Sequence, residues 1–415
     1  MLTKDLFGLA LHIRAPWFID RLTFDSEHKR LDIHIDFKRG STFSYQADGI
    51  DERDLPVHDT TQKTWRHLNF FEHECYLHAR VPRVRLTSGK VRQVHTPWEG
   101  ITNGFTLLFE ALLMQLMSAM PVHTVGRLVH VHDDKLWTIL HRYTDAARAQ
   151  EDFSGVTKIG IDETARARGH KYISLFVDLV LRRTLFATIG KGASTMARFV
   201  EDLATHGGAA TQITNASIDM SRAFIKGVRE HLPNAQITFD KFHIIKIINE
   251  AVDEVRRCEA SGSDLLKHTR YIFLKNEDNL TEKQQRKLSD LKLSKENLKT
   301  MRAYNLRLSF QQIYATATTV GEFESLLQQW YFWATHSRLE PMKQVAQTIK
   351  QHWDGIVAFQ ASNINNGILE GINSILQAAK SKARGYSTER NFIAMAYLYT
   401  GKLDFSRVNY VYSEL

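Results

Sequence analysis

The sequence predicts an α/β protein built on a mixed sheet that is flanked by helices. Three observations lead to this prediction. In residues 151–257, three strand patterns joined by short connections precede a helix–strand–helix–strand–helix order. Residues 1–100 show the strand period, and residues 259–360 carry only helical patterns. The chain therefore combines a β-rich N-terminal module, an α/β core and a long helical insertion.

The N-terminal module, residues 1–100, reads as strands and loops. Residues 31–37 alternate apolar and polar side chains, which is the pattern of a half-buried strand. Residues 80–85 form a second, basic extended segment, and residues 97–100 (Pro-Trp-Glu-Gly) close the module.

Residues 101–150 change to the helical period. Apolar residues from Phe105 form one helical stripe, which Pro121 ends. A short helix over 122–128, a turn and a second helix over 132–143 then predict a helix-turn-helix, whose second helix would enter a DNA major groove. A packed helical hairpin is the alternative. The candidate DNA contacts in this segment are Arg127, Lys135 and Arg142.

The α/β core alternates strands with helices. We expect strands over residues 157–162, 172–181, 184–189, 213–219 and 236–240. We expect helices over residues 194–205, 222–232 and 244–258. The strand connections predict a mixed sheet with helices on its faces.

These patterns divide the chain into six expected segments. They are residues 1–100, the β-rich module; 101–150, the helix-turn-helix; 151–258, the first part of the core; 259–360, the helical insertion; 361–400, the closing helices of the core; and 401–415, a tail.

Charge and cysteine usage limit the function further. The net charge of +8 and the isoelectric point near 9.3 suggest an anionic partner. Residues 266–310 hold eleven Lys and Arg against five Asp and Glu, which fits a phosphate-contacting surface or a solvated helix face. Two cysteines cannot form a disulfide framework, and no apolar run approaches membrane-spanning length. We therefore expect a soluble protein of a reducing compartment.

Three carboxylates stand at positions that would hold them in place. Asp162 and Asp219 end two expected strands, and Ser221 could cap the helix that follows Asp219. Glu370 lies in a helical stretch over residues 366–382. Carboxylates presented by strand ends and a helix suit hard divalent cations, which promote phosphoryl transfer. This pattern predicts a metal-dependent enzyme acting on nucleic acid, with Asp162 bridging two ions.

Periodicity on the last of these helices supports the assignment. Its polar side chains at spacings of four, three and four residues share one face, whereas Leu369, Ile372, Leu376 and Ala379 form an apolar stripe. The polar set is Asn366, Glu370, Asn373 and Gln377. An ordinary amphipathic helix with a solvated glutamate is the alternative.

Other polar residues near these positions have weaker assignments. Asp240 ends a strand directly before Phe242 and His243, so it is expected near the site, either behind the metal ligands or as a rival ligand. His243 is expected to donate hydrogen bonds or contact DNA rather than act as a base. Lys380, Lys382, Arg384 and Tyr386 follow the helix and could hold phosphates and stack on a base, or could form a solvated helix end.

Five stretches carry a resemblance to a known family. They are residues 159–164 (Ile-Gly-Ile-Asp-Glu-Thr), 239–246 (Phe-Asp-Lys-Phe-His-Ile-Ile-Lys), 304–308 (Tyr-Asn-Leu-Arg-Leu), 365–373 (Asn-Asn-Gly-Ile-Leu-Glu-Gly-Ile-Asn) and 382–386 (Lys-Ala-Arg-Gly-Tyr). In this order they resemble the bacterial insertion-sequence transposases of the ISL3 family. That resemblance implies a DDE transposase with a ribonuclease-H-like core and a catalytic, metal-binding triad of Asp162, Asp219 and Glu370.

The resemblance also implies the reaction and its partners. It implies two Mg²⁺ or Mn²⁺ ions, transposon-end and target DNA as substrates, and a dimer or higher assembly in the bacterial cytoplasm, associated with the nucleoid. A DDE transposase would free a 3′-hydroxyl at the element end and join it to target DNA. The competing hypotheses are a metal-dependent nuclease without strand transfer and a transposase-derived DNA-binding protein without catalysis.

One departure from the family concerns zinc. The resemblance implies paired cysteines in an N-terminal zinc ribbon, but in register with those pairs this chain has Tyr45 and Asp48, then Leu86 and Gly89. The sequence therefore predicts no structural zinc site.

Overall fold

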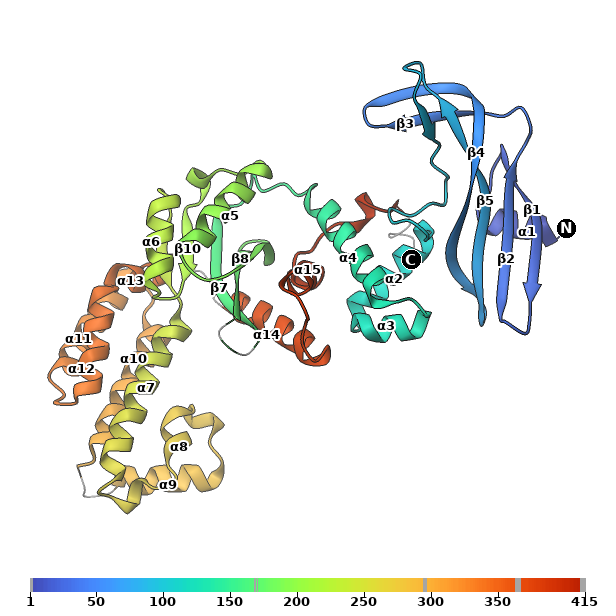
Figure 1. Ribbon diagram of the computed structural model, residues 1–415. Helices are drawn as coiled ribbons and strands as arrows, with labels where there is room; N and C mark the ends of the chain where they lie inside the picture. The colour runs from blue at the N-terminus through green and yellow to red at the C-terminus, as the bar shows by residue number, and fades with distance from the viewer. Residues whose placement is uncertain (1–2, 168, 170, 294–296, 363–366, 411–415) are drawn as a thin grey trace. The chain divides into compact units, whose positions relative to one another are not determined.

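The computed structural model describes residues 3–167, 169, 171–293, 297–362 and 367–410 (Figure 1). The chain forms two compact units. The first takes in Met1–Glu151, Lys382–Arg384 and Leu403–Leu415, and the second takes in Asp152–Ser381 and Gly385–Lys402. Each unit contains one mixed sheet, so the expected mixed α/β architecture is confirmed.

The sheet of the first unit has the order β1-β2-β5-β4-β3, with β6 paired to β5. Its strands are β1 (Trp17–Asp25), β2 (Arg30–Phe37), β3 (Thr42–Ala47), β4 (Ile50–Phe70), β5 (His73–Arg85) and β6 (Val91–Gln93), preceded by the helix α1 (Thr3–Ala10). Period-two alternation places Leu31, Ile33 and Ile35 of β2 in the core, against Trp65 and Leu77 in the same cluster. The strand predicted at residues 31–37 is therefore confirmed.

Three helices complete the first unit: α2 (Leu107–Ala119), α3 (Val122–Val129) and α4 (Asp133–Arg148). Thr106 caps α2 by accepting a hydrogen bond from the Phe109 N–H, and Pro121 separates α2 from α3. His130 makes the turn into α4 with a left-handed φ of 56°. The expected pair of helices joined by a short turn is present.

A buried glutamate joins these helices to the loop before them. The Glu110 carboxylate is fully buried and accepts hydrogen bonds from the backbone of Ile101 and Thr102 and from the Tyr143 hydroxyl on α4. Burial raises the pKa of the Glu110 carboxyl. Gly100 leaves room for it, because a Cβ at residue 100 would lie 2.4 Å from the Glu110 side chain.

The sheet of the second unit has the order β11-β10-β7-β8-β9. Its strands are β7 (Lys158–Ala167), β8 (Lys171–Asp178), β9 (Arg183–Ile189), β10 (Asn215–Ile218) and β11 (Gln236–Phe239). The pairs β7–β8 and β8–β9 are antiparallel, whereas β10 is parallel to both β7 and β11. All five expected strands are present, and β7 runs five residues past Asp162.

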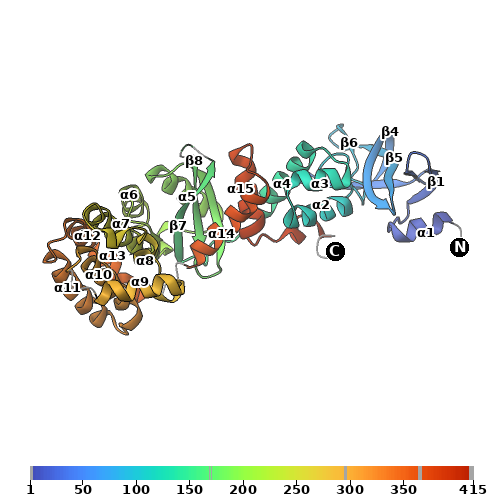
Figure 2. The same cartoon turned by 90° about the horizontal axis from the view of Figure 1, so that it is seen from below.

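Helices cover both faces of this sheet (Figures 1 and 2). The helices α5 (Ala193–Thr205) and α6 (Arg222–His231) pack on the face that carries Ile159 and Ile161 in one apolar cluster, where Phe176 stacks on Phe199 at 4.4 Å. The opposite face carries Gly160 and Asp162. It is covered by α14 (Gly367–Lys382) and α15 (Glu389–Thr400), whose Tyr397 hydroxyl accepts a hydrogen bond from the Ala187 N–H of β9.

The helix α7 (Lys241–Ala260) follows β11 and leads into the helical insertion. The insertion contains α8 (Arg270–Leu274), α9 (Glu282–Leu293), α10 (Lys299–Thr316), α11 (Val320–Thr335), α12 (Glu340–Gln351) and α13 (Trp353–Ser362). Arg307 is buried and donates to Asn249 at 2.6 Å, and the Trp330 indole N–H donates to the Leu306 carbonyl at 2.7 Å. The helix α13 lies close against β11, because a Cβ at Gly355 would lie 2.4 Å from the Phe239 ring. The insertion is therefore packed onto the edge strand of the sheet.

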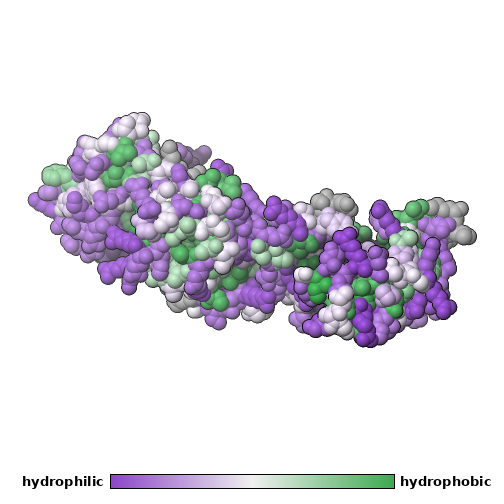
Figure 3. Space-filling view, turned by 90° about the horizontal axis from the view of Figure 1, so that it is seen from above, coloured by the Kyte–Doolittle hydropathy of each residue, from purple (hydrophilic) through white to green (hydrophobic). Residues whose placement is uncertain are grey.

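The visible surface of the molecule is mostly hydrophilic. Hydrophilic side chains predominate on the face drawn in Figure 3, and apolar ones form small separate groups. Within the described residues, no helix has both the length and the apolar character needed to cross a membrane.

Candidate active site

Three aspartates lie side by side at one edge of the second sheet. Ser217 of β10 pairs with Gly160 of β7, so Asp162 and Asp219 each lie two residues beyond a paired position on neighbouring strands. Ile218 pairs with Phe239 of β11, which brings Asp240 to the same level. The parallel pairing of β7, β10 and β11 thus brings together two of the residues expected to bind metal and their rival.

The Asp162 carboxylate is held in an unusual electrostatic setting. Its Oδ1 accepts a hydrogen bond from the Glu163 N–H at 2.7 Å. Burial, with smaller contributions from the charges of Asp240 and Asp219, raises its pKa to about 6. The Glu163 N–H and the charge of His243 oppose this shift only in part. The site therefore holds negative charge that the surrounding protein does not fully compensate.

The helix α14 is fastened along β7 by side-chain amides. Asn373 Nδ2 donates to Asp162 Oδ2 at 2.6 Å, and Gln377 Nε2 donates to Thr164 Oγ1 at 2.7 Å. The donors are four residues apart on one helix face, and the acceptors are two residues apart on one strand face. The polar face of α14 therefore follows the Asp162 face of the strand.

Close packing accompanies these bonds. Leu369 of α14 is buried, and a Cβ at Gly160 would lie 2.9 Å from its side chain and 2.8 Å from that of Leu179. Only glycine at residue 160 lets the helix approach β7 without displacing these leucines. Glycine at this position therefore sets the distance between the helix and the carboxylate strand.

Glu370 lies in the first turn of α14, directly after Leu369 and three residues before Asn373. Its side chain is exposed, in contrast to the half-buried Asp162 and Asp219. Its place on the helix puts it on the turn that precedes the contact with Asp162. Asn366, which we expected beside it, lies outside the described residues.

Asp240 and His243 form a hydrogen-bonded pair at the start of α7. Asp240 is buried; its Oδ1 accepts from the Phe242 N–H, and its Oδ2 lies 2.9 Å from His243 Nδ1. The hydrogen bond that His243 donates to Asp240 raises the pKa of His243, and the charges of Asp240, Asp162 and Asp219 act in the same direction. Both Asp240 oxygens are thus engaged within the protein, and the surrounding carboxylates favour the protonated form of His243.

The residue expected to cap α6 does not act through its side chain. Ser221 occupies the N-cap position, but the structure shows no cap hydrogen bond from its hydroxyl. Instead, Asp219 Oδ1 accepts a hydrogen bond from the Ser221 N–H at 2.9 Å. The expected serine cap is therefore wrong, because the aspartate two residues earlier already accepts a hydrogen bond at this helix start.

The basic residues after Glu370 have different surroundings. Lys380 donates to the Ala165 carbonyl, and Lys382 donates to the Ala119 carbonyl at 2.9 Å. Arg384 is exposed and adopts a left-handed φ of 57°. The Tyr386 ring stacks on Phe392 with 5.4 Å between ring centroids. Arg384 is thus the most open of the four, whereas Tyr386 already has an aromatic partner.

The candidate DNA contacts of the first unit lie on α3 and α4. Arg127 and Lys135 are exposed, the first near the end of α3 and the second in the first turn of α4. Arg142 is exposed as well, but its guanidinium donates to the Ile101 carbonyl at 2.8 Å. The charges of Arg127 and Lys135 are therefore accessible to a partner, whereas Arg142 joins α4 to the loop that precedes α2.

Thr164 and Arg166, which follow Asp162 on β7, were not among the site residues predicted from the sequence. Thr164 accepts from Gln377, and buried Arg166 donates to Glu389 at 2.6 Å and to the Tyr386 carbonyl at 3.2 Å. Both lie at even spacing from Asp162 and so share its strand face. Continuing the period-two pattern past residue 162 would have found them.

The oxygen atoms of this site suit Mg²⁺. Within the described residues, no three His, Cys, Asp or Glu side chains gather closely enough to hold a metal ion by themselves. Mg²⁺, however, commonly takes one or two carboxylates together with substrate phosphates. The buried Asn373 Oδ1 has no hydrogen-bond partner in the described part of the chain, although its amide is bonded to Asp162. Asp162, Asp219 and the Asn373 Oδ1 therefore fit a Mg²⁺ ion whose remaining ligands would be phosphate oxygens of the substrate.

Comparison with family models assigns each part of the chain. A transposase model matches residues 159–396, and the model of the helix-turn-helix domain of transposase family ISL3 matches residues 103–144. The second match covers α2, α3 and most of α4, which decides between the helix-turn-helix and the plain hairpin.

A third match corrects the expectation about zinc. The zinc-finger model of transposases IS204, IS1001, IS1096 and IS1165 matches residues 52–85, which lie in β4 and β5. Our expectation of no structural zinc is therefore wrong. It placed the family's cysteine pairs at Tyr45 and Asp48 and at Leu86 and Gly89, and all four positions lie outside the matched residues.

Individual relatives resemble most of the chain. The transposase for insertion sequence element IS1001 of Bordetella parapertussis is 30% identical over 350 residues, which cover 81% of this chain and 84% of the relative. The transposase for insertion sequence element IS1557 of Mycobacterium tuberculosis is 27% identical over 365 residues, which cover 81% of each chain.

Proposed function

The chain belongs to the ISL3 family of insertion-sequence transposases, and from this membership we propose that it cleaves DNA at transposon ends and joins the freed 3′-hydroxyl to target DNA. The observation that carries the proposal is the contact between β7 and α14. It brings the helix that bears Glu370 onto Asp162 within β7, and Asp219 directly follows the neighbouring strand β10.

We propose that the second unit has a ribonuclease-H-like core. Support comes from the strand order, in which three antiparallel strands are followed by two parallel ones, with β7 at the centre of the sheet. The insertion would then separate the core from its closing helices, at residues 259–360, and the transposase family model spans both sides of it. The boundaries given in the sequence analysis are retained as proposals.

We assign Asp162, Asp219 and Glu370 as the catalytic carboxylates and the ligands of two Mg²⁺ or Mn²⁺ ions. When bound, such ions lower the pKa of the attacking hydroxyl and neutralise charge on the phosphate. Asn373 orients Asp162 through its hydrogen bond, and Glu163 offers its N–H to the other oxygen. These two bonds leave the carboxylate with one defined direction toward the substrate.

His243 would balance the charge of the carboxylate cluster. Its hydrogen bond to Asp240 favours the protonated imidazole, which would place a cation close to Asp162 and Asp219 and to the phosphate that they receive. Asp240 acts on the reaction through His243 rather than as a ligand, because both of its oxygens are already bonded.

The proposed DNA contacts lie in the first unit. Arg127, Lys135 and Arg384 would meet phosphates of the transposon end. Because two DNA ends must be joined in one reaction, we propose that the protein acts as a dimer or a higher assembly on DNA.

The test uses a linear duplex that carries the transposon end, a target plasmid and Mg²⁺. We expect the wild-type protein to nick the end and join it to the plasmid. Asp162→Asn, Asp219→Asn and Glu370→Gln should each lose both activities by at least about 100-fold, since the metal contributes several kcal/mol. Binding to the duplex should persist. Glu201→Gln, an exposed acid on α5, is the control and should retain full activity.

The same assay separates the competing functions. A protein that nicks but never joins would be a nuclease. Binding without any cleavage by the wild type would indicate a transposase-derived DNA-binding protein. Cleavage that survives Asp162→Asn would show that the metal ligands lie elsewhere.

A further inference from the structure

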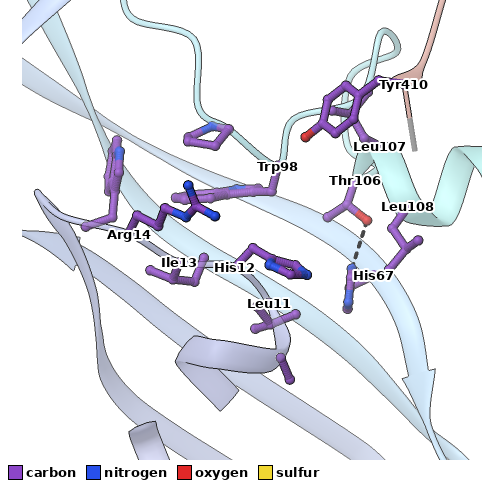
Figure 4. Close-up of a pocket in the computed structure, with 13 residues that line it drawn as sticks. Leu11, His12, Ile13, Arg14, His67, Trp98, Thr106, Leu107, Leu108 and Tyr410 are labelled. Carbon is purple, nitrogen blue, oxygen red and sulfur yellow. Dashed lines mark hydrogen bonds between the residues drawn. The ribbon is translucent and has the colours of Figure 1, made fainter. Parts of the chain in front are cut away.

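A hollow of about 560 Å³ lies within the first unit, far in sequence from the catalytic carboxylates. It is formed by the segment after α1, by Trp17 and Trp98, by the start of α2 and by Tyr410 (Figure 4). Its volume falls in the range of about 300–1,000 Å³ that is typical of ligand pockets. Nothing in the proposed cleavage and joining reaction uses it.

Rigid aromatic side chains form one wall of the hollow. Trp98 and Trp17 pack edge to face with 5.1 Å between ring centroids, and Trp98 packs in the same way on Trp65 at 5.8 Å. Trp17 and Trp98 are each more than nine-tenths buried, so their rotamers are fixed by the core of the sheet. A ring stacked on such a wall loses little freedom in the protein, which favours planar aromatic ligands.

A hydrogen-bonded pair lies on another side. His67 Nδ1 is 2.9 Å from Thr106 Oγ1, and that hydroxyl oxygen already accepts from the Phe109 N–H. Burial, assisted by the charge of Arg66, lowers the pKa of His67 to about 4, so its ring is neutral. We assign the hydroxyl proton of Thr106 to His67 Nδ1, which leaves Nε2–H as a hydrogen-bond donor.

The charge of the lining favours an anion. Arg14 and His12 are exposed, and among the described residues the Arg14 guanidinium has no hydrogen-bond or ion-pair partner. Among the described residues that line the hollow, none is an aspartate or a glutamate. Figure 4 shows Arg14 and Trp98 among the side chains that line the hollow, so one cationic group and one aromatic ring border the same space.

We propose that this hollow binds an unpaired nucleobase of DNA together with its phosphate. The base would stack on Trp98, His67 would donate to its edge, and Arg14 would hold the adjacent phosphate. The inference rests on the proposed function, in which DNA is the anionic partner of the protein. A duplex cannot enter because its bases are stacked and paired, so the ligand is single-stranded or extruded DNA.

The experiment uses the full-length protein in EDTA, so that no cleavage is required. The probes are a ten-nucleotide single strand with one central 2-aminopurine and the same strand with an abasic site in its place. Stacking on tryptophan should quench the 2-aminopurine fluorescence, and the abasic strand should bind several-fold more weakly. Leu108→Trp should fill the hollow and abolish quenching, and thermal melting will show whether this variant is folded.

Arg14→Gln provides the second variant, because this exposed side chain has no hydrogen-bond or ion-pair partner in the part of the chain that the structure describes. It should weaken binding of the single strand several-fold and lower the slope of log affinity against log salt by about 0.7. Arg39→Gln, an exposed arginine elsewhere in the same unit, should change neither the quenching nor the preference for the intact strand.

Two results would overturn the proposal: equal affinity for the intact and abasic strands, or quenching that persists in folded Leu108→Trp. The outcome is independent of the catalytic assay. If the wild type cleaves and joins DNA but does not quench 2-aminopurine, only the base site is rejected. If it quenches 2-aminopurine but shows no Mg²⁺-dependent cleavage, the proposed reaction is rejected and the base site is retained.

Discussion

Asn373 on α14 donates its amide hydrogen to Asp162 on β7, with 2.6 Å between Nδ2 and Oδ2, across 211 positions of sequence. The other atom of the same amide, Oδ1, is buried without a partner in the described part of the chain. One side chain therefore orients a carboxylate and also presents a free acceptor beside it. This relationship makes Asn373 the most direct link between the helix and the strand edge.

Replacing Asn373 with alanine should reduce Mg²⁺-dependent cleavage by roughly 10- to 100-fold, which is the effect usual for residues that orient metal ligands. The amide would no longer fix the direction of the Asp162 carboxylate, so the Mg²⁺ concentration for half-maximal activity should rise. Cleavage rates at varied Mg²⁺ measure this. Ser374→Ala, an exposed neighbour, should leave the titration unchanged. Identical Mg²⁺ titrations for wild type and Asn373→Ala would contradict the orienting role.

Asp162→Asn should stabilise the metal-free protein at pH 8. The fold raises the pKa of Asp162 from 3.8 to about 6, so between these values the unfolded chain loses a proton that the folded chain keeps. The contribution of this carboxyl group to stability is therefore full below about pH 3.8, falls as the pH rises to about 6 and is lost above it. Asparagine avoids a penalty of up to about 3 kcal/mol at pH 8.

Urea unfolding in EDTA at pH 4.5 and pH 8 measures the difference, which should fall to about a third of its pH 8 value at the lower pH. Asp152→Asn is the matched control in the same unit. Its pKa is lowered by the Ser154 N–H, so that variant should be the less stable one at pH 8. If the wild type and Asp162→Asn have the same free energy of unfolding at pH 8, burial does not destabilise the charged carboxylate.

Gly160→Ala should push α14 away from β7, because its Cβ would lie 2.9 Å from buried Leu369. We expect a loss of about 1–3 kcal/mol in the free energy of unfolding and a larger loss of cleavage. Gly371→Ala on the same helix is the control, since a Cβ there meets nothing within 4 Å. It should keep activity and gain up to about 1 kcal/mol from helix propensity. Equal stability of the two variants would contradict the close packing.

Lys135→Ala should weaken binding to duplex DNA and reduce the slope of log affinity against log salt by about 0.9, the value for one lost phosphate contact. Fluorescence anisotropy between 50 and 200 mM salt measures it. Lys343→Ala, on α12 of the insertion, changes the net charge equally and should leave the slope unaltered. An unchanged slope for Lys135→Ala would remove α4 from the DNA interface.

The element order was readable from the sequence because strands and helices here keep their periods. All five expected strands of the core are present, since apolar residues such as Ile159 and Ile161 recur at every second position and form one buried face. Strand ends were less accurate. The strand expected over residues 172–181 stops at Asp178, whose carboxylate accepts the Val180 and Leu181 N–H groups and makes a turn.

Long-range contacts were beyond the sequence. Nothing local tells that Asn373 meets Asp162, or that Gly160 accommodates Leu369, because both depend on how α14 packs after an insertion of about a hundred residues. The prediction that the chain has no structural zinc was wrong for a related reason. The register of cysteine pairs was placed outside residues 52–85, where the match to the zinc-finger family lies.

The insertion is not a detachable module. One continuous apolar cluster contains Ile218 of the sheet together with Phe310 and Trp330 of the insertion, and α13 closes on Phe239 through Gly355. Excising the insertion would expose the edge of the catalytic sheet to water and to other sheet edges, which promotes aggregation. Calorimetry should accordingly show the second unit melting in a single cooperative transition, because neither half has a core of its own to retain.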